Sequence, residues 1–203
     1  IGNPSDVNRR ISNWINNSEN AGKRWLVNLD ELGPSWKGVM PDSYDSIHDT
    51  IRYECLWGTL LAGGAGVEWY FGYRYPHNDL NLEDYRSREN WWRQSTIATT
   101  FMKRFPLEEM KANNKLVNVN GALCLEKPGE LYLIYMPSAN KNPMINLPGN
   151  KKYSVKWFDP RLGGELRDGT VSVITGKESI HLGTPPIESE KDWVAVITIN
   201  QEI

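Results

Sequence analysis

The chain has 203 residues, enough for one sizeable domain or two small ones. Its formal net charge of −2 provides no basic surface of the kind that binds nucleic acid or anionic membranes, so neither partner is expected. No apolar run reaches the roughly 18 residues that a membrane helix needs. The two cysteines, Cys55 and Cys124, lie far apart in the sequence. They predict two buried thiols rather than a disulfide framework or a zinc site, and we expect no metal and no cofactor.

Two features of the composition are unusual. Nine Trp and nine Tyr are many for this length. Such a surplus suits a sugar-binding site, where aromatic rings stack on the apolar faces of pyranoses, and equally suits a large core. The first residue is Ile rather than Met, which indicates a fragment or a processed chain.

The first half of the chain reads as alternating strands and helices. Ile11, Trp14 and Ile15 share one face of a predicted helix within residues 8–15. Residues 25–29 then form an apolar run that predicts a buried strand. This strand ends in two acids and a breaker, which are Asp30, Glu31, Gly33 and Pro34.

The two acids have two interpretations. In the first, one acid caps the next segment and the other is solvated. In the second, the strand delivers a carboxylate to its C-terminal end, as catalytic strands of parallel α/β folds do. Side chains alternate along a strand, so Asp30 and Glu31 should point in opposite directions.

A βαβ unit follows from the next three segments. Residues 46–61 predict a helix with a capping-box-like start, an apolar stripe that includes Ile47 and Cys55, and a glycine-rich stop. Residues 67–73 then predict an aromatic strand, parallel to the first. His48, near the start of the helix, is expected at the surface.

The loop after the second strand is polar and precedes a second helix. It carries His77, Asn78 and Asp79, which suit substrate contacts or a plain turn. The helix is predicted over residues 87–105, with Pro106 ending it. A charge network of Asp84, Arg86 and Arg88 is expected to fix the loop.

In the second half of the chain, the spacing of apolar residues changes from the helical period to the alternation typical of strands. Short alternating segments separated by Pro and Gly turns predict an all-β sandwich, with the domain boundary near residue 112, so that residues 1–112 and 113–203 form the two domains. Trp157 and Trp193 are expected in the core of this sandwich. The predicted strands are 116–119, 122–126, 131–136, 153–158, one near 171, 179–182 and 193–199.

Several blocks in the same order resemble the bacterial apiosidase-like glycoside hydrolases. They are Asp30 to Pro34, Leu61 to Tyr73, Asn78 to Leu80, Asp84 to Arg88 and Trp157 to Arg161. The resemblance covers nearly the whole chain but only the C-terminal half of the family's architecture. It implies an α/β plus all-β fold, in which the last βα units of a (β/α)8 barrel precede a small antiparallel β-sandwich of the type named collagen-binding.

The resemblance also implies a function and a site. Glu31 occupies the place of the nucleophile at the end of the seventh barrel strand, and Trp69 that of the aromatic floor under the sugar. Tyr70, Tyr73, His77, Asn78 and Asp79 are the further candidates for substrate contacts. The implied substrate is a poly- or oligosaccharide, and the implied location is secreted or periplasmic.

The general acid of these enzymes lies on an earlier strand, outside this chain. Retaining hydrolysis needs two carboxyl groups, so we expect the chain alone to be inactive. A non-catalytic module that binds carbohydrate or matrix is the alternative function. Self-association through the exposed edge of an incomplete barrel is also expected.

Overall fold

The computed structural model describes residues 6–32, 34–81, 83–140 and 142–200. The chain divides into two compact units, residues 1–102 and 103–203. The boundary lies earlier than the expected residue 112. The reason is that β3 (Lys111–Ala112) pairs antiparallel with β4 (Leu123–Lys127) and therefore belongs to the second unit.

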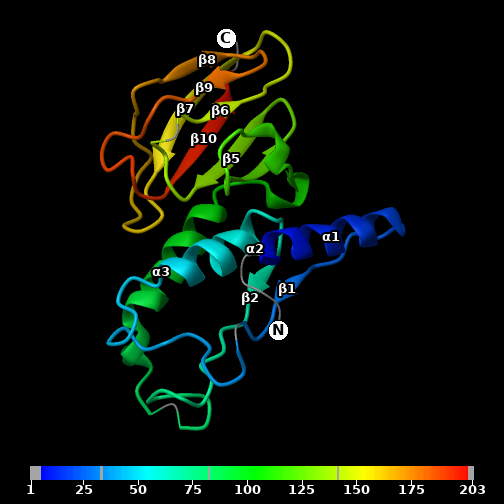
Figure 1. The fold of residues 1–203 in the computed structure, drawn as a ribbon. Coiled ribbons are helices and arrows are strands. Elements are labelled where there is room, and N and C mark those ends of the chain that lie inside the picture. The colour runs from blue at the N-terminus through cyan, green and yellow to red at the C-terminus, as the bar shows by residue number, and fades with distance from the viewer. Residues whose placement is uncertain (1–5, 33, 82, 141, 201–203) are drawn as a thin grey trace. The chain divides into compact units, whose positions relative to one another are not determined.

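The first unit alternates helices with two very short parallel strands. In Figure 1 the strands lie side by side, and the segments that follow them extend together beyond the strand ends. The described elements are α1 (Val7–Asn20), β1 (Asn28–Leu29), the π-helix η2 (Ile51–Trp57), α2 (Gly58–Leu60), β2 (Gly66–Val67), the 3-10 helix η3 (Tyr85–Arg88) and α3 (Glu89–Met102).

The predicted parallel pairing is confirmed, but both strands are shorter than expected. Asn28 pairs with Gly66 and Leu29 with Val67. Trp25 and Leu26 lie outside this ladder and are 55% and 90% exposed, so their predicted burial is wrong. A two-stranded pair provides no neighbouring strand to cover them. The predicted self-association through this edge stays a prediction.

The second predicted strand ends early because its chain turns away from β1. The last bond of the ladder is the one that the Glu68 amide donates to the Leu29 carbonyl, at 2.8 Å. Three residues later the Phe71 amide donates to the Asp79 carboxylate instead, also at 2.8 Å. The aromatic segment 69–73 is therefore loop rather than strand.

The helix expected over residues 46–61 is real but begins later, with η2 continuing directly into α2. Cys55 is buried as predicted, whereas Ile47 is 57% exposed and His48 is completely buried. The predicted surface place of His48 is thus wrong. Residues 46–48 are not helical, so the 3.6-residue period does not govern which side chain faces inward there.

The two flanking helices match their predicted apolar faces in most places. Ile11 and Ile15 of α1 are buried, but Trp14 is 56% exposed. In α3 the predicted inward face is confirmed. The residues expected on this face were Trp91, Gln94, Ala98, Met102 and Phe105, and the first four are buried. The helix ends at Met102 rather than before Pro106, so Phe105 lies beyond it and is half-buried.

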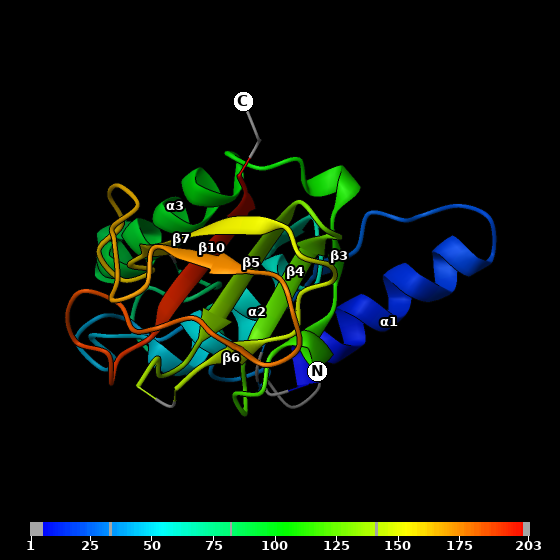
Figure 2. The ribbon, with the colours of Figure 1, turned by 90° about the horizontal axis from the view of Figure 1, so that it is seen from above.

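The second unit consists of antiparallel strands around an apolar core. Six strands form a sheet in the order β3-β4-β5-β10-β7-β8, and Figure 2 shows its central strands side by side. A separate two-stranded sheet pairs β6 with β9. The remaining bounds are η4 (Leu107–Glu109), η5 (Asn114–Leu116), β5 (Leu131–Met136), β6 (Met144–Ile145), β7 (Lys152–Phe158), β8 (Val173–Thr175), β9 (Ile180–His181) and β10 (Trp193–Ile199).

Side chains from both sheets meet in one apolar cluster. Trp157 of β7 and Trp193 of β10 are fully buried there, as predicted, together with Ile145 of β6 and Ile180 of β9. The predicted strand at 116–119 is wrong: it is replaced by η5 and by a single bridge between Val117 and Ile145.

Candidate functional site

The site predicted from the sequence lies where the two parallel strands end. The register pairs Leu29 with Val67, so Glu31 and Trp69 each follow their strand by the same two residues. In a parallel sheet the carboxyl ends of neighbouring strands share one edge. The candidate nucleophile and the candidate sugar platform are therefore brought to the same edge of the sheet.

Glu31 is exposed and has an unusual backbone conformation. Its φ is 45°, in the left-handed region that non-glycine residues seldom adopt. Such outliers concentrate at functional sites, where the surrounding structure holds them. The predicted alternation of Asp30 and Glu31 along a regular strand therefore does not apply, because the chain has already left the strand.

Tyr70 lies near the Glu31 carboxylate. Partial burial is the main reason that the pKa of Tyr70 is raised, and the negative charges of Asp79 and Glu31 raise it further. The phenol therefore stays protonated, and its O–H donates to the Ser35 carbonyl. Tyr70 thus links the segment after β2 to the segment after β1 beside the candidate nucleophile.

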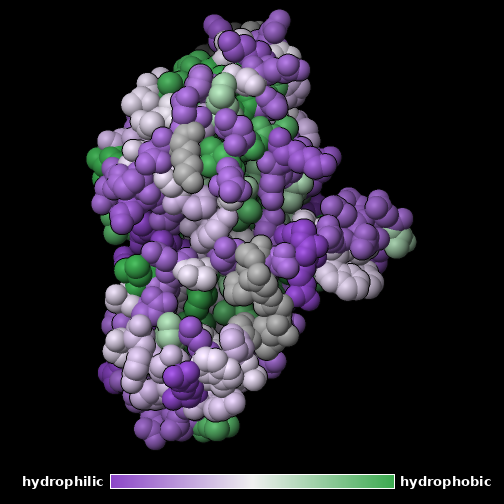
Figure 3. Space-filling view, viewed as in Figure 1, coloured by the Kyte–Doolittle hydropathy of each residue, from purple (hydrophilic) through white to green (hydrophobic). Residues whose placement is uncertain are grey.

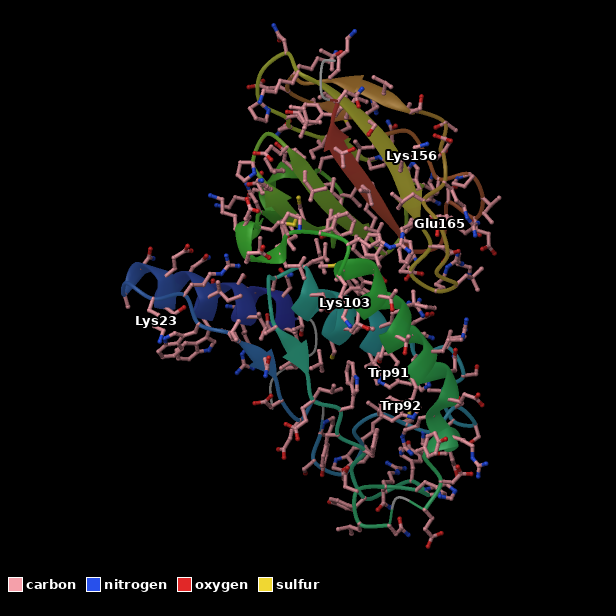
Figure 4. The ribbon with its side chains drawn as sticks, turned by 180° about the vertical axis from the view of Figure 1, so that it is seen from behind. Lys23, Trp91, Trp92, Lys103, Lys156 and Glu165 are labelled. Carbon is pink, nitrogen blue, oxygen red and sulfur yellow. The ribbon has the colours of Figure 1, made fainter. Side chains whose placement is uncertain are left out.

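Trp69 rests on a row of buried side chains. Its ring meets Trp91 of α3 edge to face, with ring centroids 4.6 Å apart, and remains partly exposed. Trp91, labelled on α3 in Figure 4, is fully buried and packs in turn against the His48 ring at 5.4 Å. The orientation of Trp69 is therefore set from beneath by α3.

His48 is held by two carboxylates. Its Nε2 lies 2.7 Å from Asp42 Oδ1, and its Nδ1 lies 3.8 Å from Asp45 Oδ2. The second oxygen of Asp42 accepts from the Asn90 amide at the start of α3, at 2.8 Å. The Nε2 contact gives the buried imidazole one hydrogen bond, while its Nδ1 has no hydrogen-bond partner among the described residues. Asp42 thereby connects the segment before η2 with α3.

The side chains of two predicted contact residues, Asn78 and Asp79, bond mainly to backbone groups of the loop. The Asn78 amide nitrogen donates to the carbonyls of Tyr73 and Tyr75, at 3.2 and 2.7 Å. The Asp79 carboxylate accepts from the Phe71 amide, while the side chain remains exposed. Asn78 thus shapes the loop from inside it, and Asp79 fastens the loop to the end of β2. Their roles in substrate binding stay predictions.

Tyr73 and His77 differ in how far they reach into solvent. Tyr73 is 57% exposed on the same loop. His77 is partly buried, and its Nδ1 has no hydrogen-bond partner in the described part of the chain. Its carbonyl accepts from Arg88 Nη1 at 2.7 Å.

Arg88 was expected in a charge network with Asp84 and Arg86, but its guanidinium is fully buried and bonds elsewhere. Its Nε donates to the Val39 carbonyl at 2.8 Å, and the group lies 4.5 Å from the centroid of the Phe71 ring. Burial lowers its pKa, against the charges of Asp79 and Asp42. Arg88 therefore joins three segments around the site.

The expected charge network is thus only partly correct. Asp84 pairs with Arg86 at 2.8 Å near the surface, while Arg88 makes no ion pair with an acid among the described residues. An arginine at the N-terminal end of an amphipathic helix, next to the inward-facing Trp91, was the available signal. For His48 the signal was the pair of aspartates at positions 42 and 45.

The described residues can also be considered as metal ligands and as membrane spans. Within the described ranges, no group of three or more His, Cys, Asp and Glu side chains is arranged to hold a metal ion. No helix there combines the length and the apolar character that crossing a bilayer requires. Gly33, part of the predicted breaker, lies outside the described residues.

Comparison with known proteins finds likeness in fold. No family model matches the chain, and no curated protein matches it. Among solved structures, the chain is similar to a glycoside hydrolase family 5 protein from Bacteroides vulgatus ATCC 8482, with 16% identity and a TM-score of 0.57 over 93% of this chain and 45% of that one. It is also similar to a structure described as a glycoside hydrolase, with 11% identity and a TM-score of 0.64 over 100% of this chain and 48% of the other. The chain therefore spans less than half the length of these structures and shares the fold of that part of them.

Proposed function

We propose that this chain is the C-terminal part of a retaining glycoside hydrolase that acts on poly- or oligosaccharides. In this proposal the first unit contains the last βα units of a (β/α)8 barrel, with Glu31 as nucleophile and Trp69 as the floor of the sugar site. One observation carries it: an exposed carboxylate and a partly exposed indole lie at matching places beyond the ends of two paired parallel strands. The likeness in fold to glycoside hydrolases supports it.

The chemistry requires a second carboxyl group. In retaining hydrolysis, one ionised carboxylate attacks the anomeric carbon while a carboxylic acid roughly 5 Å away protonates the departing oxygen. Glu31 would form the ester with the sugar, and water would then hydrolyse that ester. We expect the acid on an earlier barrel strand of the full-length protein.

Trp69 would hold the sugar while Glu31 reacts. Aromatic rings stack on the apolar faces of pyranoses, and a fixed ring orders the sugar better than a mobile one. The edge-to-face contact of Trp69 with the buried Trp91 supplies that fixation. Remote positioning of this kind strongly affects rate, because misplacement by about 1 Å can lower it about a hundredfold.

The experiment is Glu31→Gln in the full-length protein, assayed by the release of reducing sugar from a panel of polysaccharides. Loss of a nucleophile should lower kcat by several orders of magnitude while the circular dichroism spectrum stays unchanged. In Glu31→Ala, added azide should restore turnover, because a small anion can occupy the vacated space and yield a glycosyl azide. Trapping with a 2-fluoroglycoside should label the peptide that contains Glu31.

Asp30→Asn and Glu68→Gln are the matched controls, since both remove an exposed carboxylate within one residue of Glu31 or Trp69. Each should keep near-normal turnover. Activity that survives Glu31→Gln would overturn the assignment of the nucleophile. Azide rescue in Asp30→Ala rather than in Glu31→Ala would transfer the role to Asp30.

For the second unit we propose a packing role. Its two tryptophans, Trp157 and Trp193, are both fully buried, so neither ring is available to a ligand. No observation favours the alternative function, a binding module. We also expect the full-length protein to be secreted or periplasmic, where polysaccharides occur, and fractionation of cells that produce it tests this.

A further inference from the structure

Four side chains form a row near the candidate site. The guanidinium carbon of Arg74 lies 4.8 Å from the centroid of the Trp36 ring and 5.7 Å from that of Tyr75. The ring of Tyr75 in turn lies 4.7 Å from that of Tyr44. We call Trp36, Arg74, Tyr75 and Tyr44 the aromatic platform.

The backbone beneath the platform is tightly fixed. The Arg74 amide donates to the Trp36 carbonyl at 3.0 Å, and the Val39 amide donates to the Tyr70 carbonyl at 2.7 Å. Gly38 and Gly72 permit this approach. Both have positive φ, and a Cβ on Gly38 would lie 2.2 Å from Tyr70 O, or on Gly72 2.6 Å from the Trp36 backbone. The segments after β1 and β2 are therefore held against each other without help from a ligand.

The platform faces solvent. Trp36 is 36% and Tyr44 59% exposed, and Arg74 is exposed as well. Figure 3 shows much of the surface over the loops of the first unit in the pale colours of residues of intermediate hydropathy. Because their backbone segments are already ordered, these side chains lose less freedom on binding a ligand than those of a mobile loop would.

Arg74 has unused binding capacity. Within the described part of the chain it makes no ion pair with an acidic side chain, and its guanidinium carbon lies over the rings of Trp36 and Tyr75. Stacking uses the faces of a guanidinium and leaves the N–H groups along its edge free. Those groups match a carboxylate in a two-bond, planar arrangement.

The platform also adjoins the candidate site. Ser35, next to Trp36, accepts the hydrogen bond of Tyr70, whose pKa is affected by Glu31. Tyr73, next to Arg74, is exposed on the same loop. A saccharide chain on Trp69 would thus have further aromatic surface to extend along.

We propose that the aromatic platform binds an acidic sugar, a uronate unit of the oligosaccharide, with its carboxylate on the edge of Arg74 and its pyranose ring on the aromatic side chains. This rests on the proposed function, since it places the uronate in the same saccharide chain that Glu31 cleaves. It narrows the substrate to acidic poly- or oligosaccharides. A neutral sugar would use the rings and leave the guanidinium without a partner.

The test measures binding separately from turnover. The full-length protein carrying Glu31→Gln is applied to an array of oligosaccharides that contain glucuronate, galacturonate or mannuronate, each also present as its methyl ester. The ester keeps the shape of the sugar and removes its charge. We expect the acid form of at least one oligosaccharide to bind about tenfold or more tightly than its ester, as charge-assisted hydrogen bonds imply.

Two variants and one control complete the test. Arg74→Gln should abolish the preference for the acid, and Arg74→Lys should reduce it, because lysine keeps the charge but not the planar edge. Arg10→Gln removes an exposed arginine from α1 and should leave the preference intact. Equal binding of acids and esters, no binding to any acid, or a preference that survives Arg74→Gln would each overturn the platform's assignment.

The two proposals fail in different ways. If Glu31→Gln abolishes turnover but the array shows no acid preference, only the uronate site is overturned. If acids bind through Arg74 while turnover survives Glu31→Gln, only the nucleophile is overturned.

Discussion

The two units of this chain are stabilised in different ways. In the second unit, long antiparallel ladders and one apolar cluster fix the chain, and β5 is buried along its whole length. In the first unit each strand has only two residues, and the segments that follow them are fixed by buried polar side chains such as Arg88, His48 and Asn78. Side-chain bonds can hold a loop in a shape that a regular ladder does not allow. The candidate functional site accordingly lies in the unit with the less regular structure.

The largest expected effect tests the apolar core of the second unit. Trp157→Ala removes a fully buried indole and should lower the free energy of unfolding by about 3–5 kcal/mol, as large-to-small core substitutions do. Urea denaturation followed by circular dichroism measures it. Val173→Ala, at a residue that is 52% exposed, is the control and should change stability little. Comparable losses in both variants would contradict the description of this core.

The next effect tests the polar framework of the first unit. Arg88→Met keeps the volume but leaves the carbonyls of Val39 and His77 without their donor, which should cost about 2–3 kcal/mol, since hydrogen bonds to charged groups are the stronger kind. We also expect faster proteolysis within residues 70–85. Arg93→Met, at an exposed arginine of the following helix α3, is the matched control. Unchanged proteolysis would show that Arg88 does not hold the loop.

A smaller effect is expected at the buried imidazole. His48→Phe retains a ring against Trp91 but leaves an Asp42 oxygen without its partner, and should lower the free energy of unfolding by about 1–3 kcal/mol. Combining it with Asp42→Asn in a double-mutant cycle isolates the coupling between the two side chains. Strict additivity of the two substitutions would argue against a direct interaction.

The last prediction concerns the two thiols, which affect stability only above neutral pH. Burial raises the pKa of Cys55 to about 12, with the charge of Glu54 adding to it, and burial raises the pKa of Cys124 as well. Because the folded pKa values exceed those of the unfolded chain, both thiols stay protonated at pH 8. Their contribution to stability is complete below the unfolded pKa and is lost as the pH rises through the folded values.

Thiol reagents provide the measurement. At pH 8 neither cysteine should react with a disulfide reagent until urea unfolds the protein, after which both should react. Unfolding curves should shift to lower urea between pH 9 and 11, as the unfolded chain gains thiolates. Fast labelling of the native protein would disprove the burial of at least one thiol.

The sequence predicted the regular parts of the molecule well. Strands at residues 131–136 and 193–199 coincide with β5 and β10, because an apolar run with turn residues at both ends has few alternatives. The buried face of α3 followed from its period, and the parallel pairing of β1 and β2 from the βαβ order. Glu31 and Trp69 each follow their strand by two residues, and their roles at a common site stay predictions.

The missed features depend on long-range polar contacts. The burial of His48 requires Asp42 from an earlier turn and Trp91 from a later helix. The burial of Arg88 requires carbonyls of residues far away in the sequence. No local period encodes such contacts. The early end of the second strand has the same origin, because the Asp79 carboxylate takes the amide that a ladder would otherwise use.

The left-handed backbone at Glu31 has a consequence for protein engineering. A glycine or asparagine adopts that conformation at lower energy than glutamate, so Glu31→Gly or Glu31→Asn should stabilise the fold by about 1 kcal/mol. Selection for heat resistance alone would therefore favour loss of the candidate nucleophile. A thermostabilised library made from this protein should be screened for turnover at every round, since under the proposed function the carboxylate would be kept by its use and not by the fold.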